Sequence, residues 1–84
     1  IMNKLLIKVY VPYIAEEYDV FIPINKKIGT IKILLINAIK EIAECSELNI
    51  NTLKIYDKIT GKKLDNNILV KDSNLENGSK LILL

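Results

Sequence analysis

The stretch from Ile28 to Cys45, IGTIKILLINAIKEIAEC, constrains the fold of this 84-residue chain more than any other segment. Its apolar residues recur at spacings of three and four, which places them on one stripe of a helix with 3.6 residues per turn. The stripe residues are Ile28, Ile31, Leu35, Ala38, Ile39 and Ile42. A helix over this stretch is roughly 27 Å long at 1.5 Å per residue. Such a helix needs a sheet against its apolar stripe, and we expect the remaining segments to supply the strands.

Apolar residues alternate with other residues in the segments on both sides of this helix, which is the period of a strand. The predicted strands are 5–11, 18–24, 52–56 and 79–84, with a short additional strand at Leu64. The turn 13–17 makes the first two strands an antiparallel hairpin. Asn77-Gly78 predicts a tight turn before the last strand.

One arrangement buries every apolar stripe at once. The first and last strands lie side by side in the middle of a mixed sheet, and the helix packs across it. This is the α+β β-grasp fold, with four to five strands and one helix. The length allows a single domain, which we place over residues 1–84.

Composition argues against several classes of function. All twelve basic residues are lysine and the net charge is only +2, whereas readers of nucleic acid usually rely on arginine. The sequence has no histidine, the usual acid–base group and the commonest metal ligand. No apolar run reaches the 18 residues of a membrane span, and a lone Cys45 fits a reducing compartment. We therefore expect a cytoplasmic protein that binds no nucleic acid and does not insert into membranes.

The candidate catalytic and metal-binding motifs fail on spacing. Gly61-Lys62-Lys63 lacks the second glycine and the hydroxyl residue of a phosphate-binding loop. The acidic residues at 16, 17 and 19 lack the remaining ligands of a calcium loop. Cys45 has no histidine to activate it. We expect no catalytic residue, no metal site and no cofactor, and hence no enzyme.

The strand alternation predicts an interaction surface. Residues that alternate with the core set point away from the helix, and together they form one continuous face. These residues are Leu6, Lys8, Tyr10, Lys54, Tyr56, Ile82 and Leu84. Tyrosines and large aliphatic groups are favoured anchors in interfaces. A weak homodimer through the same face is the alternative use, and a second, smaller patch is predicted at Ile33, Ile36 and Lys40.

The order of elements resembles that of ubiquitin. The matching features are Tyr18-x-Val20-x-Ile22, Ile28-x-x-Ile31-Lys32-x-x-Leu35 and the ending Ser73-Asn74-Leu75-Glu76-Asn77-Gly78-Ser79-Lys80-Leu81-Ile82-Leu83. Ubiquitin and the sulfur carriers close with a Gly-Gly tail, which this sequence does not show. Among tailless bacterial relatives it is similar to the YukD/EsaB group, on its size, its Tyr18-Asp19-Val20 strand and its Leu75-x-Asn77-Gly78-Ser79-x-Leu81 ending. The abundance of isoleucine, lysine and asparagine fits a low-GC bacterium, with Met2 as the natural start and Ile1 as a remnant.

The resemblance implies a non-enzymatic protein-interaction module, an accessory or regulator of type VII (WXG100) secretion. It also implies that the open sheet face is the surface that meets the partner. Two alternatives remain open. One is a carrier protein, for sulfur or conjugation, whose Gly-Gly tail has been truncated. The other is an adaptor subunit of a monooxygenase or a similar complex.

Overall fold

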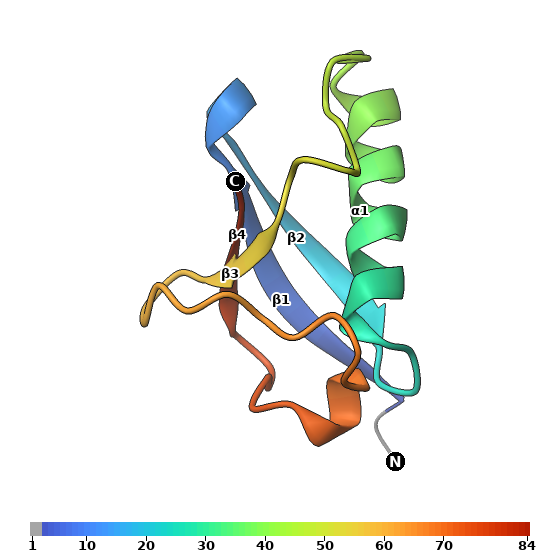
Figure 1. Ribbon diagram of the computed structural model, residues 1–84, viewed down its shortest axis with the longest axis vertical. Coiled ribbons are helices and arrows are strands. Elements are labelled where there is room, and N and C mark those ends of the chain that lie inside the picture. Colours follow the sequence, from blue (N-terminus) through green and yellow to red (C-terminus); the bar gives the residue numbers. More distant parts are fainter. Residues whose placement is uncertain (1–2) are drawn as a thin grey trace.

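A computed structural model describes residues 3–84, so the expectation about Ile1 and Met2 lies outside the described residues. Within these residues the chain forms four strands and one α-helix, which are labelled in Figure 1. Their bounds are β1 (Lys4–Val11), β2 (Glu16–Pro23), α1 (Ile28–Ile42), β3 (Ile55–Asp57) and β4 (Lys80–Leu83). Two 3₁₀ turns, Pro12–Ile14 and Val70–Asp72, join them.

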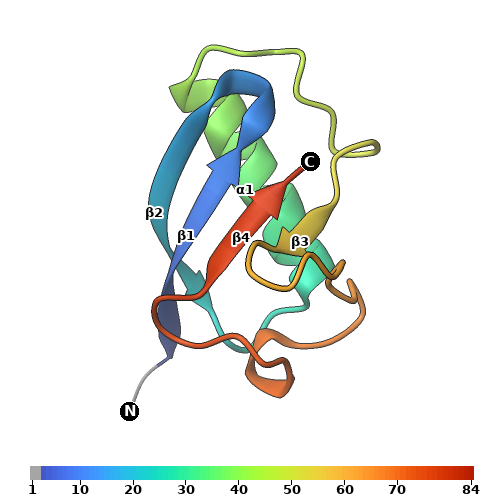
Figure 2. The same cartoon turned by 90° about the vertical axis from the view of Figure 1, so that its left-hand side faces the viewer.

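The strands form one sheet in the order β2-β1-β4-β3, with α1 packed across a single face (Figures 1 and 2). β1 and β4 are parallel in the centre, and the two outer pairs are antiparallel. The predicted β-grasp architecture is therefore confirmed, with four strands. A fifth strand at Leu64 does not form within residues 3–84, because only a single bridge joins Tyr56 to Lys63 before the chain turns away at Asp65.

The core lies between the helix and the sheet. Every second residue of β1 from Ile7 onward is fully buried there, together with apolar residues from the other strands, from α1 and from the 3₁₀ turn Val70–Asp72. On the strands and loops these buried residues are Ile7, Val9, Val11, Ile22, Leu48, Ile55, Val70, Leu81 and Leu83. The period-two interpretation of β1 and β2 is correct, because residues that are buried or half-buried alternate with more exposed ones along each strand.

The buried stripe of α1 is rotated relative to the predicted one. Ile28, Ile31, Leu35 and Ile39 are buried as expected, but Ala38 is exposed and Ile42 is 69% exposed. Ile36, which was expected to lie outside the stripe, is 0% exposed. The connection from α1 to β3 runs back along the helix (Figure 1); it adds Leu48 to the core cluster and packs the partly buried Ile50 and Leu53 against that cluster. This connection covers the flank that carries Ile36.

The helix ends three residues before Cys45 because the chain turns there. Glu44 adopts a left-handed conformation with φ 51°. The amide of Glu44 donates to the Glu41 carbonyl at 3.3 Å, and the amide of Cys45 donates to the Lys40 carbonyl at 3.0 Å. These two bonds form a Schellman motif, which satisfies carbonyls that the helix leaves unpaired. A glutamate in place of the usual glycine gives no sequence signal for this end.

The start of α1 is fixed by the segment 66–68. The amides of Ile28 and Gly29 donate to the carbonyls of Ile68 and Asn66 at 2.9 and 3.0 Å. A side chain at Gly29 would place its Cβ 3.1 Å from Asn66, which is a tight contact, so the close approach favours glycine. No side chain caps this end, and backbone carbonyls satisfy the first helical amides instead.

Candidate protein-interaction surface

The face of the sheet opposite α1 carries a row of three large side chains. The β1–β4 register places Tyr10 beside Ile82, and the β3–β4 register places Ile82 beside Tyr56. All three side chains point away from the helix, because their neighbours Val9, Leu81 and Ile55 are buried in the core. They are only partly buried themselves. The row crosses three strands and is apolar and aromatic along its length.

All seven residues of the predicted surface lie on this face, which we call the sheet patch. Its members are Leu6, Lys8, Tyr10, Lys54, Tyr56, Ile82 and Leu84. Lys54 and Leu84 exchange two backbone hydrogen bonds of 3.2 and 2.9 Å, which extends the β3–β4 ladder and places their side chains on the same side as Tyr56. No described helix covers this side of the central strands (Figure 2). The predicted grouping of these residues is therefore what the fold produces.

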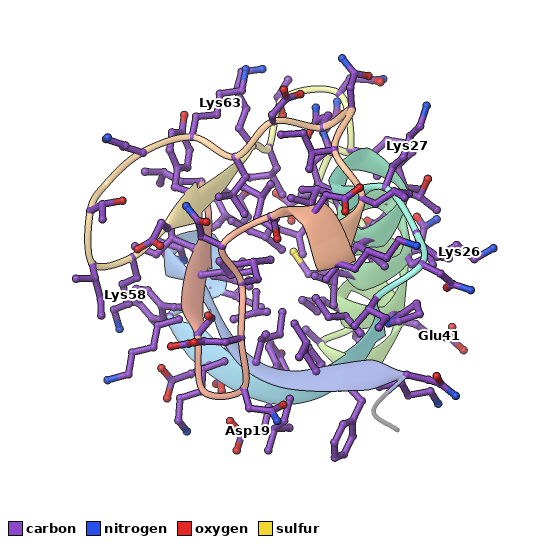
Figure 3. All side chains as sticks on the ribbon, turned by 90° about the horizontal axis from the view of Figure 1, so that it is seen from below. Asp19, Lys26, Lys27, Glu41, Lys58 and Lys63 are labelled. Atoms are coloured by element: carbon purple, nitrogen blue, oxygen red, sulfur yellow. The ribbon has the colours of Figure 1, made fainter. Side chains whose placement is uncertain are left out.

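Lys8 of the sheet patch and Lys58 beside the patch each lie close to an acidic residue of β2. Lys8 Nζ lies 3.0 Å from Asp19 Oδ1, and this hydrogen bond raises the pKa of Lys8 above its ordinary value. Lys58 Nζ lies 5.0 Å from the centre of the Tyr10 ring and 3.9 Å from Glu17 Oε2. The charged groups therefore border the tyrosine rather than interrupt the apolar row. Asp19 and Lys58 both lie on the side of the sheet away from α1 (Figure 3).

Sequence reasoning missed two parts of this face. Phe21 pairs with Leu6 across β1 and β2 and is 68% exposed, so it extends the apolar surface toward the edge of the sheet. The alternation of Phe21 with Val20 and Ile22 along the sequence is a signal that could have placed Phe21 on this face. Lys58 lies just beyond β3, and its position over Tyr10 depends on a strand pairing that sequence spacing does not reveal.

The second predicted patch does not form. Ile33 is 43% exposed, but Ile36 is buried in the core and cannot contact a partner. Lys40 is half-buried on the same helix. The prediction was wrong because it treated the flank of α1 as open, whereas the connection to β3 covers it.

The described part of the chain offers no arrangement for metal chemistry. Over residues 3–84, no three side chains of histidine, cysteine, aspartate or glutamate come close enough to hold a metal ion. Cys45 is a half-buried free thiol. The single α-helix, Ile28–Ile42, is too short to span a membrane, and the described residues contain no other candidate.

Comparison with solved structures identifies the fold as ubiquitin-like. A ubiquitin of Caldiarchaeum subterraneum aligns over 95% of this chain and 90% of its own, with 14% identity and a TM-score of 0.68. The ubiquitin-like domain of Arabidopsis thaliana protein At2g32350 aligns over 99% and 78%, with 14% identity and a TM-score of 0.67. A chain of the MycP5-free ESX-5 inner membrane complex aligns over 99% of this chain but 21% of its own, with 10% identity and a TM-score of 0.72. No family model and no curated protein matches the sequence.

Proposed function

We propose that this chain is a non-enzymatic protein-interaction module that binds a protein partner through the sheet patch. The observation that carries the proposal is the continuous row Tyr10–Ile82–Tyr56 on a sheet face that no described helix covers. Tyrosine combines a rigid apolar ring with a polar tip, which makes it a frequent anchor in interfaces. Lysines and carboxylates together form a charged rim of mixed sign around this apolar centre, which matches the usual layout of an interface with an apolar core and a polar rim.

We further propose that the partner belongs to type VII secretion and that the protein acts in the cytoplasm. The resemblance to the YukD/EsaB group supports this pathway. A chain of the ESX-5 inner membrane complex shares the fold of this protein, and this shared fold is the structural support for the proposed pathway. The carrier and adaptor hypotheses stay predictions, and a Gly-Gly motif encoded just after Leu84 would favour the carrier.

Affinity capture from cells of the source organism tests the proposal. The test variant combines Tyr10→Thr with Ile82→Thr, because threonine keeps a high strand propensity while it removes the anchors. We expect the folded double variant to lose the partner that the unaltered chain captures. The matched control is Ile33→Ala on the opposite layer, which should capture the partner normally. Undiminished capture by the double variant would place the binding site elsewhere.

A further inference from the structure

β2 lies at the edge of the sheet, and half of its backbone groups face away from β1. The amide of Ile24 donates to the Asn3 carbonyl at 3.0 Å, which fixes the phase of the β1–β2 ladder. In this phase the even-numbered residues of β2 bond to β1, and the odd-numbered residues point outward. Among residues 3–84, no segment pairs with the outward amides and carbonyls of Glu17, Asp19 and Phe21. An edge of this kind can accept one further strand.

The two sides of this edge differ in chemistry. On the outer side stand Glu17 and Asp19, whose side chains remain 44% and 61% exposed despite their ion pairs with lysines. On the inner side, Tyr18 and Val20 are only half-buried. The helix α1 adds further exposed apolar residues next to this inner side of β2. They lie on the flank of α1 that the α1–β3 connection does not cover. These are Leu34, Ala38 and Ile42.

We propose that the free edge of β2 binds an extended peptide segment in which apolar and basic residues alternate. Successive side chains of a strand point to opposite faces, so one set of its residues would lie against the apolar inner side and the other beside the carboxylates. Its backbone would bond to the outward groups of β2. This site uses backbone groups and is separate from the sheet patch, so it goes beyond the proposed function.

Charge argues against a second copy of this chain as the occupant. Two β2 strands paired edge to edge would bring Glu17 and Asp19 of one copy close to the same carboxylates of the other. Like charges on neighbouring strands are destabilising. Basic residues on an incoming strand would instead be attracted to the carboxylates of Glu17 and Asp19. We therefore expect the bound segment to carry basic residues.

The probe is the blocked heptapeptide KVKVKVK, titrated into the ¹⁵N-labelled chain and followed by NMR and amide hydrogen exchange. We expect saturable shifts centred on β2, and slower exchange of the amides of Glu17, Asp19 and Phe21 by about tenfold at saturation. The amides of Tyr18, Val20 and Ile22 already bond to β1 and serve as an internal control. The control peptides are EVEVEVE, which reverses the charge, and KKVVVKK, which removes the alternation.

A pair of variants at one position isolates the backbone contribution. Asp19→Pro removes an outward amide without removing a β1–β2 bond, and proline is tolerated at an edge strand on its solvent side. Asp19→Asn removes the charge but keeps the amide. We expect the proline variant to bind KVKVKVK about tenfold more weakly than the asparagine variant. If the proline variant does not fold, two N-methylated forms of KVKVKVK replace this comparison. One form is N-methylated on its lysines and the other on its valines. Only the form whose unmethylated amides face β2 should bind, because alternate residues of a strand present their amides to opposite edges.

Several results would overturn the proposal. Equal binding of KVKVKVK and KKVVVKK would indicate charge attraction alone, and shifts confined to the sheet patch would place the peptide there. Concentration-dependent shifts of β2 without peptide would make a second copy the occupant. No binding at all would mean that the acidic edge only prevents unwanted strand pairing. The Tyr10→Thr, Ile82→Thr variant should bind the peptide normally, so this site can fail or succeed independently of the proposed function.

Discussion

Ile36→Ala tests the corrected position of the helix on the sheet. The substitution removes three carbon atoms from a side chain with 0% exposure. At about 0.8 kcal/mol per buried methylene, the transfer loss alone is about 2.4 kcal/mol, and an unfilled cavity adds to it. We therefore expect a loss of about 2–5 kcal/mol in the free energy of unfolding. This is a large share of the roughly 4–13 kcal/mol expected for 84 residues.

Urea unfolding followed by far-ultraviolet circular dichroism measures this loss. With a slope near 1 kcal/mol per molar for a small domain, the midpoint should fall by about 2 M or more. The matched control is Ile33→Ala, one turn earlier on the same helix and 43% exposed. Alanine also recovers some helix propensity there, so its loss should stay below about 1 kcal/mol. Similar losses of unfolding free energy for the two variants would refute the assignment of Ile36, but not Ile33, to a covered flank of α1.

Two further predictions concern local contacts. Glu44→Gly should raise stability by about 0.5–1 kcal/mol in thermal melts, because glycine adopts the left-handed conformation at φ 51° without the strain of a side chain. A fall in stability would contradict the Schellman assignment. The Tyr13 hydroxyl donates a hydrogen bond of 3.0 Å to Glu47, which raises the pKa of Tyr13 above its ordinary value. The stability that this bond contributes should be complete below the unfolded pKa and be lost as pH rises through the folded value. NMR titration of the Tyr13 ring should show Glu47→Gln lowering this pKa, and an unchanged value would exclude the bond.

The sequence predicts the layers of this fold well because local periodicity reports burial. Alternation along β1 separates the buried Ile7 and Val9 from the outward Lys8 and Tyr10, and the structure agrees. The sheet patch follows directly from that alternation together with the central parallel pair. Its grouping can therefore be predicted from the strand pattern and the order of the strands.

The errors arise where long-range packing decides the outcome. Ile36 is buried by a connection that follows it in the chain, and helical periodicity carries no information about such a cover. Ile42 is exposed because it lies in the last turn before the chain leaves the helix. The Lys58 contact with Tyr10 likewise requires the turn after β3 to return its side chain over β1. Such contacts depend on tertiary structure and not on spacing.

The most direct measurement of the proposed function is an NMR titration of the ¹⁵N-labelled chain with the captured partner. If the sheet patch is the binding surface, the largest shifts should fall on Tyr10, Tyr56 and Ile82 and on their neighbours across β1, β3 and β4. Residues of α1 around Ile33 should change little. A partner that instead shifts α1, and leaves the three central residues unchanged, would contradict binding through the open face of the sheet.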